Sequence, residues 1–402
     1  MGVVKKLHAG PEATSIPRKI VSRIVGVGPR FWTLSLRRFL AENSVYGLMK
    51  PSLLTAVLSL MCWSRLCAAS PAENDLQKAI DEAIRSGGGE VRIPVGTIII
   101  EAGLRIKNAK NLRIIGEDRF SSILRLPPAA FAETAEPTPV GATTIRLRRQ
   151  QRLLPEMPLR IEAEGEIDSF TKARKPYQPA KVKSVLATEL HLEEPLAFPV
   201  PEGTLIRDRA APNLFEVSGK SDGVRIENLT IDGGRAEGDP HIRGHAELCG
   251  IFVQGKYSYE LGPTETRPTH IIVSRCTIRN CHGRGVAFYA VEDSEVNYCE
   301  ISDTTDEAVD LDHFTVRTSV YENEIRRCSE GMELNDASDC VVRDNRFIGC
   351  VVGINVWQFV KLEGWNENNV IQGNRFEGTR KQPLQIQKHL TKNSVSNNTI
   401  VP

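Results

Sequence analysis

The sequence predicts an all-β protein built as a solenoid, in which short strands stack coil upon coil. Apolar residues in the second half recur at one position at intervals of about 24 residues, which is typical of one coil per repeat. A short stretch of alternating apolar and polar residues follows each recurrence, as in a half-buried strand. Asparagine occupies the same position in four successive repeats, and aromatic residues make up only 6% of a chain that has 31 glycines.

Length and charge exclude several classes of protein. The 402 residues, of which 41% are hydrophobic and 25% charged, suffice for a large buried core. Lysine and arginine number 51 against 50 aspartate and glutamate residues, so the formal net charge is +1. No long-range field therefore attracts this protein to a polyanion or to an anionic membrane. We expect no nucleic acid among its partners, and a disordered chain is excluded.

The N-terminal part is predicted to be a targeting region. Residues 1–48 are basic and lack apolar periodicity, which indicates an unstructured or misassigned extension. Residues 49–69 have a basic start, an apolar run and a small-residue end, the pattern of a signal peptide. The apolar run is about 11 residues long, too short to span a bilayer as a helix. We therefore expect a secreted or periplasmic protein with no membrane span; a transit peptide and lipidation at Cys67 are the alternatives.

Residues 70–126 are predicted to form the capped start of the solenoid. The segment 74–86 places apolar residues on one helical face, with Asn74 as its N-cap and a run of three glycines as its stop. A solenoid needs a terminal cap to cover its core, and an amphipathic helix is suited to that role. The stretches 90–100 and 111–126 follow as strands of the first coils.

Residues 127–212 interrupt the period. Proline becomes frequent there, and alternating stretches such as TTIRLR and ATELHLEEPLAF appear. This pattern predicts a small inserted β-barrel or β-hairpin module. The arginines Arg146, Arg148, Arg149 and Arg152 are interleaved with acids, which favours a solvated strand face over a binding patch.

Residues 213–402 carry the main repeat. One apolar column contains Val273, Val296, Val320, Val342, Ile371 and Val395. A second column, five residues later in each repeat, contains Ile278, Ile301, Ile325, Phe347, Phe376 and Ile400. Alternating strands then begin at Val286, Val309, Met332, Ile354 and Leu384. Each coil is therefore expected to contain at least two short strands whose apolar side chains face inward.

Asparagine follows the first column by three residues in four consecutive repeats, at Asn323, Asn345, Asn374 and Asn398. Stacked coils place such side chains about 4.8 Å apart, where the amides can hydrogen-bond along the column. The sequence therefore predicts an asparagine ladder. Most cysteines after residue 69 also fall at repeat positions as small core residues. Because stacked parallel side chains rarely meet disulfide torsions, free buried thiols are expected.

The coils resemble the right-handed parallel β-helix superfamily of pectate lyases, polygalacturonases and phage tailspike-like proteins. The resemblance rests on residues 224–400 and, more loosely, on the N-terminal segment. It implies a right-handed parallel β-helix and a polysaccharide partner. The polygalacturonase signatures do not occur in register, and alginate epimerases of this fold carry Asp-Pro-His where this chain has Asp310-Leu311-Asp312-His313. The resemblance therefore supports the fold and the substrate class rather than a named activity.

The outward positions of the strands that follow each turn are acidic in the middle of the stack. Asp310 and Asp312 lie two residues apart on one face, so their carboxyls should be roughly 6–7 Å apart, with Glu333 one coil away at roughly 5 Å. Glycosidases place an acid and a base or nucleophile at such distances. Together with the adjoining His313, these three are the predicted catalytic residues. They are equally a candidate oxygen site for Ca²⁺.

Residues around this group are predicted to bind the glycan. Trp357 offers a plane on which a sugar can stack. The other candidates are Tyr289, Arg284, Asn335 and Gln254. In a lyase or epimerase, Arg284 or a cation would neutralise a uronate while Tyr289 or His313 moved protons. His241, Arg243 and His245, on an irregular excursion, are expected to overhang the site.

The leading hypothesis is an exported protein that binds and cleaves a polysaccharide in an open groove along one sheet by paired-carboxylate glycoside hydrolysis. The alternatives are a uronate lyase or epimerase, and a non-catalytic carbohydrate-binding or surface protein in which Trp357, Tyr289 and the outward polar residues bind glycan without turnover. A separate interpretation of the acids alone is that they are simply solvated. The last coil has no recognisable cap over its strand edges, and homo-oligomerisation through that end is expected.

Overall fold

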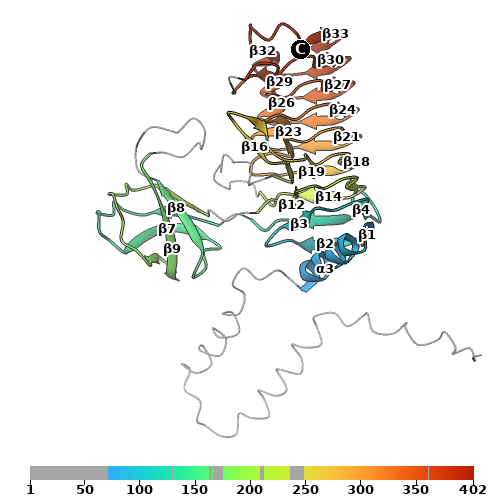
Figure 1. Ribbon diagram of the computed structural model, residues 1–402. Coiled ribbons are helices and arrows are strands. Elements are labelled where there is room, and N and C mark those ends of the chain that lie inside the picture. The colour runs from blue at the N-terminus through green and yellow to red at the C-terminus, as the bar shows by residue number, and fades with distance from the viewer. Residues whose placement is uncertain are drawn as a thin grey trace, which may run out of the picture. The chain divides into compact units, whose positions relative to one another are not determined.

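The computed structural model describes residues 71–402 apart from 129, 163–164, 166–174, 209–211, 236–248 and 361. The predicted extension, 1–48, and signal peptide, 49–69, lie outside the described residues. Within the described part of the chain, no helix has the length and apolar character that a membrane crossing requires. What is described is a helix, a stack of β-coils and a barrel inserted between two coils (Figure 1).

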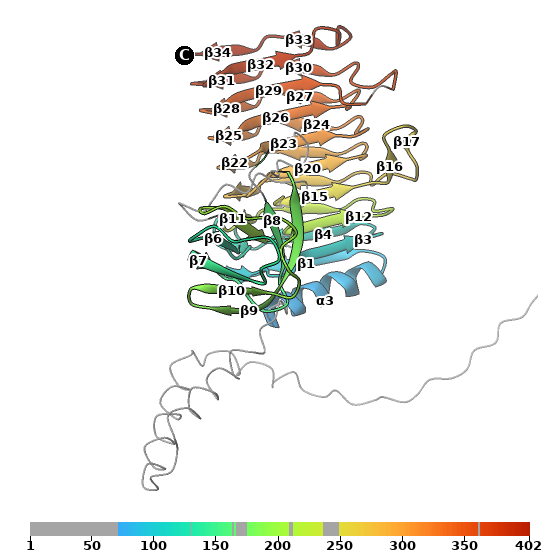
Figure 2. The same cartoon turned by 90° about the vertical axis from the view of Figure 1, so that its left-hand side faces the viewer.

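Three parallel sheets run along the coil stack (Figures 1 and 2). The first sheet contains β1 (Gly89–Ile93), β4 (Leu112–Gly116), β13 (Arg225–Glu227), β18 (Ile272–Ser274), β21 (Glu295–Asn297), β24 (Ser319–Tyr321), β27 (Val341–Arg343), β30 (Val370–Gln372) and β33 (Ser394–Ser396). The second contains β2 (Gly96–Ile99), β5 (Ser122–Arg125), β14 (Thr230–Asp232), β19 (Thr277–Arg279), β22 (Glu300–Ser302), β25 (Glu324–Arg326), β28 (Arg346–Ile348), β31 (Arg375–Glu377) and β34 (Thr399–Val401). The third contains β3 (Leu104–Lys107), β12 (Phe215–Ser218), β15 (Ile251–Gln254), β20 (Val286–Tyr289), β23 (Glu307–Asp312), β26 (Glu330–Asn335), β29 (Val352–Trp357) and β32 (Gln382–Ile386).

The predicted columns are confirmed in register. The first column pairs from Val273 to Val395 within the first sheet. The second pairs from Ile278 to Ile400 within the second sheet. The strands predicted to follow each turn form the third sheet, and their apolar residues are buried.

Each coil has three strands, where the sequence predicted at least two. The two apolar columns belong to different sheets because the chain bends sharply between them. A residue with positive φ marks this bend in successive coils, at Arg275, Tyr298, Glu322, Asp344, Gly373 and Asn397. The left-handed conformation costs little at asparagine, aspartate or glycine but more elsewhere, so bulky residues such as Tyr298 are held there by the stacked strands.

The asparagine ladder forms at this bend, as predicted. The Asn323 amide Nδ2 donates to Asn345 Oδ1 at 2.9 Å, and Asn345 Nδ2 donates to Asn374 Oδ1 at 3.0 Å. Asn374 Nδ2 continues the column by donating to Asn398 Oδ1 at 3.0 Å. Each Oδ1 also accepts the backbone N–H of the preceding ladder residue. The ladder therefore satisfies amide groups that the core would otherwise leave without partners.

The cysteines behave as predicted. All seven in the described part of the chain are free and buried, at Cys249, Cys276, Cys281, Cys299, Cys328, Cys340 and Cys350. Most join the core of the stack. They act as small apolar residues, because burial raises the pKa of most of these thiols and keeps them protonated.

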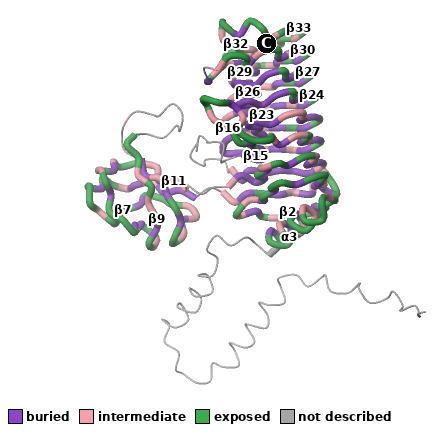
Figure 3. The backbone as a smooth tube through the Cα atoms, in the orientation of Figure 1, coloured by how far each residue is buried: buried purple, intermediate pink, exposed green. Residues whose placement is uncertain are grey.

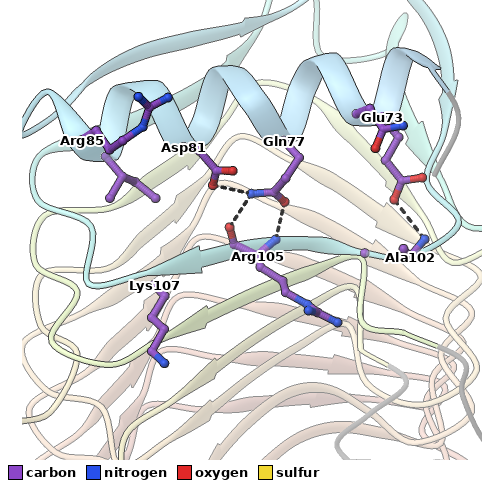
Figure 4. Close-up of a pocket in the computed structure, with 10 residues that line it drawn as sticks. Glu73, Gln77, Asp81, Arg85, Ala102, Arg105 and Lys107 are labelled. Atoms are coloured by element: carbon purple, nitrogen blue, oxygen red, sulfur yellow. Dashed lines mark hydrogen bonds between the residues drawn. The ribbon is translucent and has the colours of Figure 1, made fainter. Parts of the chain in front are cut away.

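Helix α3 (Pro71–Arg85) caps the first coil. It begins three residues before the predicted Asn74 cap, because Pro71 is well suited to a first helical position. The Gln77 side chain bonds both backbone groups of Arg105 on the edge strand β3, donating at 2.9 Å and accepting at 2.8 Å (Figure 4). Glu73 accepts from the backbone N–H groups of Glu101 and Ala102. The cavity lined by these residues is thus the seam of the cap, where side chains replace a missing neighbouring strand.

The interruption of the repeat is a closed six-stranded antiparallel barrel, which confirms the predicted insertion. Its strands are β6 (Phe131–Thr134), β7 (Thr144–Gln151), β8 (Pro158–Glu162), β9 (Tyr177–Leu186), β10 (Glu189–Leu192) and β11 (Leu205–Asp208). The barrel has a separate hydrophobic core. Arg148 and Arg149 both ion-pair with Glu133 and are about half exposed, as expected for a solvated strand face.

The core of the stack extends continuously from α3 to the last coils. Figure 3 shows buried residues alternating along the strands of the stack, with the exposed residues concentrated in turns and in α3. In the third sheet, however, both faces of β23 are buried. This departure from inward burial and outward exposure locates the candidate site.

Candidate functional site

The third sheet presents two outward columns, as the sequence predicted. In one, the register aligns Phe252, Ala287, Asp310, Glu333, Asn355 and Gln385. In the other it aligns Gln254 with Tyr289 and Asp312, and Asn335 with Trp357. The inward residues between them, such as Val309 and Leu311, anchor β23 in the core. Alternation along the strands therefore brings the predicted site residues to one face.

The acids on this face are buried. Asp310 is 0% exposed, Asp312 4% and Glu333 6%. The alternative that the outward acids are solvated is therefore wrong, and they do not line an open trough. Asp310, Asp312 and Glu333 each place a carboxylate oxygen within 4.8 Å of the other two. We call these three, with Glu307 and Asp336, the acidic cluster.

Arg284 lies inside the acidic cluster rather than at its mouth. Its Nε is 2.7 Å from Glu307 Oε2 and 2.7 Å from Asp310 Oδ2, and its side chain is 13% exposed. The guanidinium is thus already engaged by two carboxyls. The prediction that Arg284 neutralises a uronate is not favoured by this placement, because Glu307 and Asp310 occupy its Nε.

Burial controls the protonation of the cluster. It raises the pKa of Asp310 to about 8, against the opposing effect of the Arg284 charge. Burial also raises the pKa of Glu307 and of Glu333 well above the usual carboxyl range, and neighbouring carboxylates add to the effect on Glu333. At neutral pH these carboxyls therefore hold protons.

His313 is the second cation of the site. Its Nδ1 is 2.9 Å from Asp312 Oδ1 and 3.8 Å from Asp336 Oδ2. Burial would lower the pKa of His313, but the charge and hydrogen bond of Asp312 outweigh it and raise the pKa to about 9. His313 and Phe314 both have positive φ, at 37° and 71°, and turn the chain out of β23. This strained turn is what holds the imidazolium against the two carboxylates.

Aromatic rings enclose His313. Tyr289 meets it edge-on at 4.8 Å between ring centroids, and Tyr257 and Tyr259 lie at 5.1 Å. The Tyr259 hydroxyl is 3.4 Å from His313 Nε2. Tyr257 belongs to the short hairpin of β16 (Tyr257–Ser258) and β17 (Gly262–Pro263), and Tyr259 to its turn. With Tyr259 at 41% and Phe359 at 46% exposure, the rings form the solvent-facing border of the cluster.

Known proteins identify the fold at this point. Residues 215–400 match the family described as "Right handed beta helix region". These residues form a right-handed parallel β-helix. The N-terminal fragment of bacteriophage phi29 gene product 12 is 12% identical, with 92% of this chain and 60% of that chain covered and a TM-score of 0.45. A DFA-IIIase from Arthrobacter chlorophenolicus A6 is 12% identical, with 78% and 66% covered and a TM-score of 0.41.

The periplasmic alginate epimerase AlgG is also similar, at 12% identity and a TM-score of 0.37. The alignment covers 47% of this chain and spans 42% of the length of AlgG. No curated protein matches the sequence. At these identities and TM-scores the likeness carries no argument about activity, which has to be argued from the side chains of the site.

The remaining predicted residues of this β-helix have different surroundings. Gln254 is exposed beside Tyr289. Asn335 is 3% exposed, and its Oδ1 has no hydrogen-bond partner in the described part of the chain. Trp357 is half-buried, with its Nε1 likewise unpaired there, and it packs against Phe359 at 6.1 Å. The predicted overhanging residues, His241, Arg243 and His245, lie outside the described residues.

Asp336 connects the cluster to the loop that follows β29. Its carboxylate accepts the backbone N–H of Phe359 at 2.9 Å and of Val360 at 3.1 Å. The same loop lines a cavity of about 610 Å³ with Gln358, Trp365 and His389 among its walls. Two further cavities, lined by α3 residues such as Gln77 and Leu76, lie at the cap of the first coil.

Sequence reasoning missed Tyr257, Tyr259 and Phe359, which occupy excursions with no place in the repeat. It also missed that Glu307 pairs with Arg284 and that Asp336 contacts His313. Each of these two acids lies one residue away from an outward position of its strand. The dense acids of TTDEAVDLDHF were the one signal in the sequence that pointed to Glu307.

The acidic cluster has some of the features of a Ca²⁺ site. Its oxygen donors and 4.8 Å spacing suit a hard cation. However, Arg284 lies 2.7 Å from Asp310, and His313 lies 2.9 Å from Asp312. A dication would be placed beside two buried cations, so this donor set does not fit Ca²⁺ well.

Proposed function

We propose that this protein binds and cleaves a polysaccharide by glycoside hydrolysis with retention of configuration. Asp310 is the general acid and Asp312 the nucleophile. The observation that carries the proposal is a pair of carboxyls with opposite environments within 4.8 Å of each other. Asp310 is buried with its pKa raised to about 8, whereas Asp312 lies against the His313 imidazolium. Environments that separate two carboxyls in this way assign an acid and a nucleophile.

The reaction follows from these positions. The Asp310 proton passes to the glycosidic oxygen while Asp312 bonds to the anomeric carbon, and the bond to the leaving sugar breaks. Water then attacks that carbon, gives its proton to Asp310 and displaces Asp312. Retaining enzymes place the two carboxyls about 5–5.5 Å apart, whereas inverting enzymes need roughly 6.5–9.5 Å to admit water. The separation here, within 4.8 Å, is nearer to the retaining range and too short to admit that water.

His313 is a positioning residue in this mechanism. Its Nδ1, 2.9 Å from Asp312 Oδ1, holds the nucleophile in position. Asp336 supports the ring from the other side and fixes the backbone of Phe359. A change at Asp336 therefore acts on the nucleophile through His313 and on the aromatic border through the loop.

A polymer substrate is supported by the extent of the outward face. The half-exposed rings of Tyr259, Trp357 and Phe359 offer planes for stacking on sugars. The cavity beyond Gln358 continues from this border. Hydrolysis is favoured over a uronate lyase or epimerase, because the cation that would neutralise a uronate, Arg284, is already held by two carboxyls.

The test is cleavage of a panel of neutral, amino and uronate polysaccharides, measured as release of reducing ends. Asp310→Asn and Asp312→Asn are expected to remove cleavage while Asp344→Asn, an exposed aspartate on a distant bend, retains it. Proton NMR of the first product distinguishes retention from inversion, and near-ultraviolet absorbance reveals elimination. Saturable binding without cleavage by the unmodified protein contradicts hydrolysis and leaves a binding protein.

We also propose export to the periplasm or the cell exterior, supported by the signal-like pattern of residues 49–69. N-terminal sequencing of the exported product is expected to begin at Ser70. Recovery of only unprocessed chain inside the cell contradicts this.

A further inference from the structure

The acidic cluster holds more acids than cations. Its five carboxyl groups face two cations, Arg284 and His313, that ion-pair with them among the described residues. Glu333 has no ion-pair partner there. Buried carboxylates normally require a compensating charge, since burial of an uncompensated ion is costly. Among the described residues the site therefore has fewer cations than carboxyl groups.

Protons balance this count. Burial raises the pKa of Glu307, Asp310 and Glu333, so these groups remain protonated where exposed carboxyls are ionised, and the other two carboxyls of the cluster equal the two cations in number. A ligand that brings its own positive charge can replace such protons and release them on binding. An anionic ligand replaces no proton and adds a charge that nothing compensates.

The unsatisfied atoms on the same face are mainly hydrogen-bond acceptors. Asn335 Oδ1, Asn355 Oδ1 and Asp310 Oδ1 have no hydrogen-bond partner in the described part of the chain. Asn335 is only 3% exposed. Its side chain lies on the same face of β26 as that of Glu333, which precedes it by two residues. Unpaired buried acceptors call for a ligand that carries N–H or O–H donors.

Aromatic rings complete the environment that a cation prefers. Tyr289 is 6% exposed and packs edge-on against Phe252 at 5.2 Å, beside the outward acids. Its pKa is raised by burial, so the ring is a neutral phenol. The faces of such rings attract ammonium groups, and the attraction grows where water is excluded.

We propose that the acidic cluster binds the protonated amine of an amino sugar, so that the substrate is a glycan with free, non-acetylated amines. This inference rests on the proposed hydrolysis and names its substrate class. An ammonium carries a single charge, which can take the place of a bound proton, and three donors, which match the unpaired acceptors. Ca²⁺ carries no donors and twice the charge next to Arg284 and His313. A uronate brings the wrong sign of charge.

The chemistry gives a second reason for an excess of acids. Glycoside cleavage passes through a transition state with positive charge on the sugar ring. An ammonium on the same sugar repels the positive charge that develops on the ring and so raises the energy of the transition state. Carboxylates fixed around the ammonium and the ring offset this repulsion, and their effect is strongest where water is excluded.

The experiment compares one glucosamine polymer before and after chemical N-acetylation, so that linkage is held constant. Calorimetric titration of the full chain at pH 7 is expected to give at least about ten-fold tighter binding of the free-amine form. The measured enthalpy should vary with buffer ionisation enthalpy, because binding releases protons. A galacturonate polymer should bind weakest. Equal or tighter binding of the acetylated form, absence of proton release, or no binding of either form overturns the inference.

Variants separate recognition from folding. Glu333→Gln keeps the shape and removes a carboxyl, so the preference for the free amine should fall about ten-fold. Asn335→Ser removes an unpaired acceptor and should weaken the free-amine form selectively. Glu300→Gln, an exposed residue of the second sheet, is the matched control and should change nothing. Thermal unfolding verifies that each variant is folded, and retention of the full preference in both folded test variants overturns the proposal.

Failure of this inference and failure of hydrolysis give different results. If neutral polysaccharides are cleaved with no preference for amines, the substrate class is wrong and hydrolysis stands. If the free-amine polymer binds with proton release but no reducing ends appear, the ligand class stands and hydrolysis is wrong.

Discussion

Two buried polar columns in this molecule arise from the same stacking but differ in how well their atoms are paired. In the asparagine ladder, each amide bonds the next coil and the adjacent backbone. In the acidic cluster, carboxyls are crowded, protonated by burial and partly without donors. A column of amides can pair the donor of one side chain with the acceptor of the next, whereas a column of carboxyls offers mainly acceptors and repels where it is ionised. The ladder thus stabilises the stack, whereas the crowded carboxyls do not stabilise it in the same way, which agrees with the ligand-binding role that we propose for the cluster.

The largest expected effect is on activity at the cluster. Asp312→Asn should lower the rate of cleavage by about 10³-fold, because the amide cannot form the bond to the anomeric carbon. Its melting temperature should stay close to that of the unmodified protein. The measurement is initial reducing-end release, normalised to folded protein. If this variant keeps full activity, Asp312 is not the nucleophile, and the contrast between a stabilising ladder and a functional cluster is wrong.

The next effect is on stability at the ladder. Asn345→Ala removes bonds to Asn323, Asn374 and the Val320 carbonyl, and it should cost about 3 kcal/mol of unfolding free energy. Asn398→Ala, in the less buried last coil, should cost about 1 kcal/mol. Chemical denaturation measures both. Equal costs at the two positions mean that stacking between buried amides is not what stabilises the ladder.

The pH dependence should distinguish the columns, because only the cluster titrates. The pKa of Asp310 is raised from 3.8 to about 8 and that of His313 from 6.5 to about 9, so both groups bind protons more tightly in the folded state. Their contribution to stability is complete at acid pH and is lost between about pH 4 and pH 9. Cleavage should fall above about pH 8 as the acid deprotonates. Asp310→Asn should flatten part of the stability profile, whereas Asn345→Ala should leave its shape unchanged.

The smallest expected effect is that of a chelator. Because Arg284 and His313 already compensate two of the three candidate metal-ligating carboxyls, EDTA should change cleavage by less than about two-fold. Restoration of lost activity by Ca²⁺, but not by Mg²⁺, contradicts this and assigns the site to a metal.

The regular part of the fold was predictable because it depends on side-chain period alone. The columns from Val273 to Val395 and from Ile278 to Ile400 align as expected, and so do Asp310 and Glu333. The third strand of each coil was not predicted, since the bend at residues such as Arg275 and Glu322 interrupts no apolar pattern. The start of α3 was misplaced because Pro71 and Asn74 both suit a helix N-terminus.

The chemistry of the site was only partly predictable. The outward direction of Asp310 and Asp312 follows from alternation along β23, but their burial follows from residues of other coils and excursions. Arg284 was expected to face a substrate, and it instead pairs with Glu307 and Asp310. No sequence pattern marks which partner a long side chain takes, because that depends on distances between coils.

The sequence by itself determined the stack, its register and the presence of several acids on one sheet, because strand alternation and repeat length are local properties of the chain. Only the tertiary structure decided that those acids are buried, that burial raises the pKa of Asp310 and Glu333, and that tyrosines from the hairpin of β16 and β17 border them. Desolvation depends on every atom nearby in space, whatever its place in the chain. The same Asp-Leu-Asp segment would be an ordinary solvated strand if the neighbouring excursions were absent.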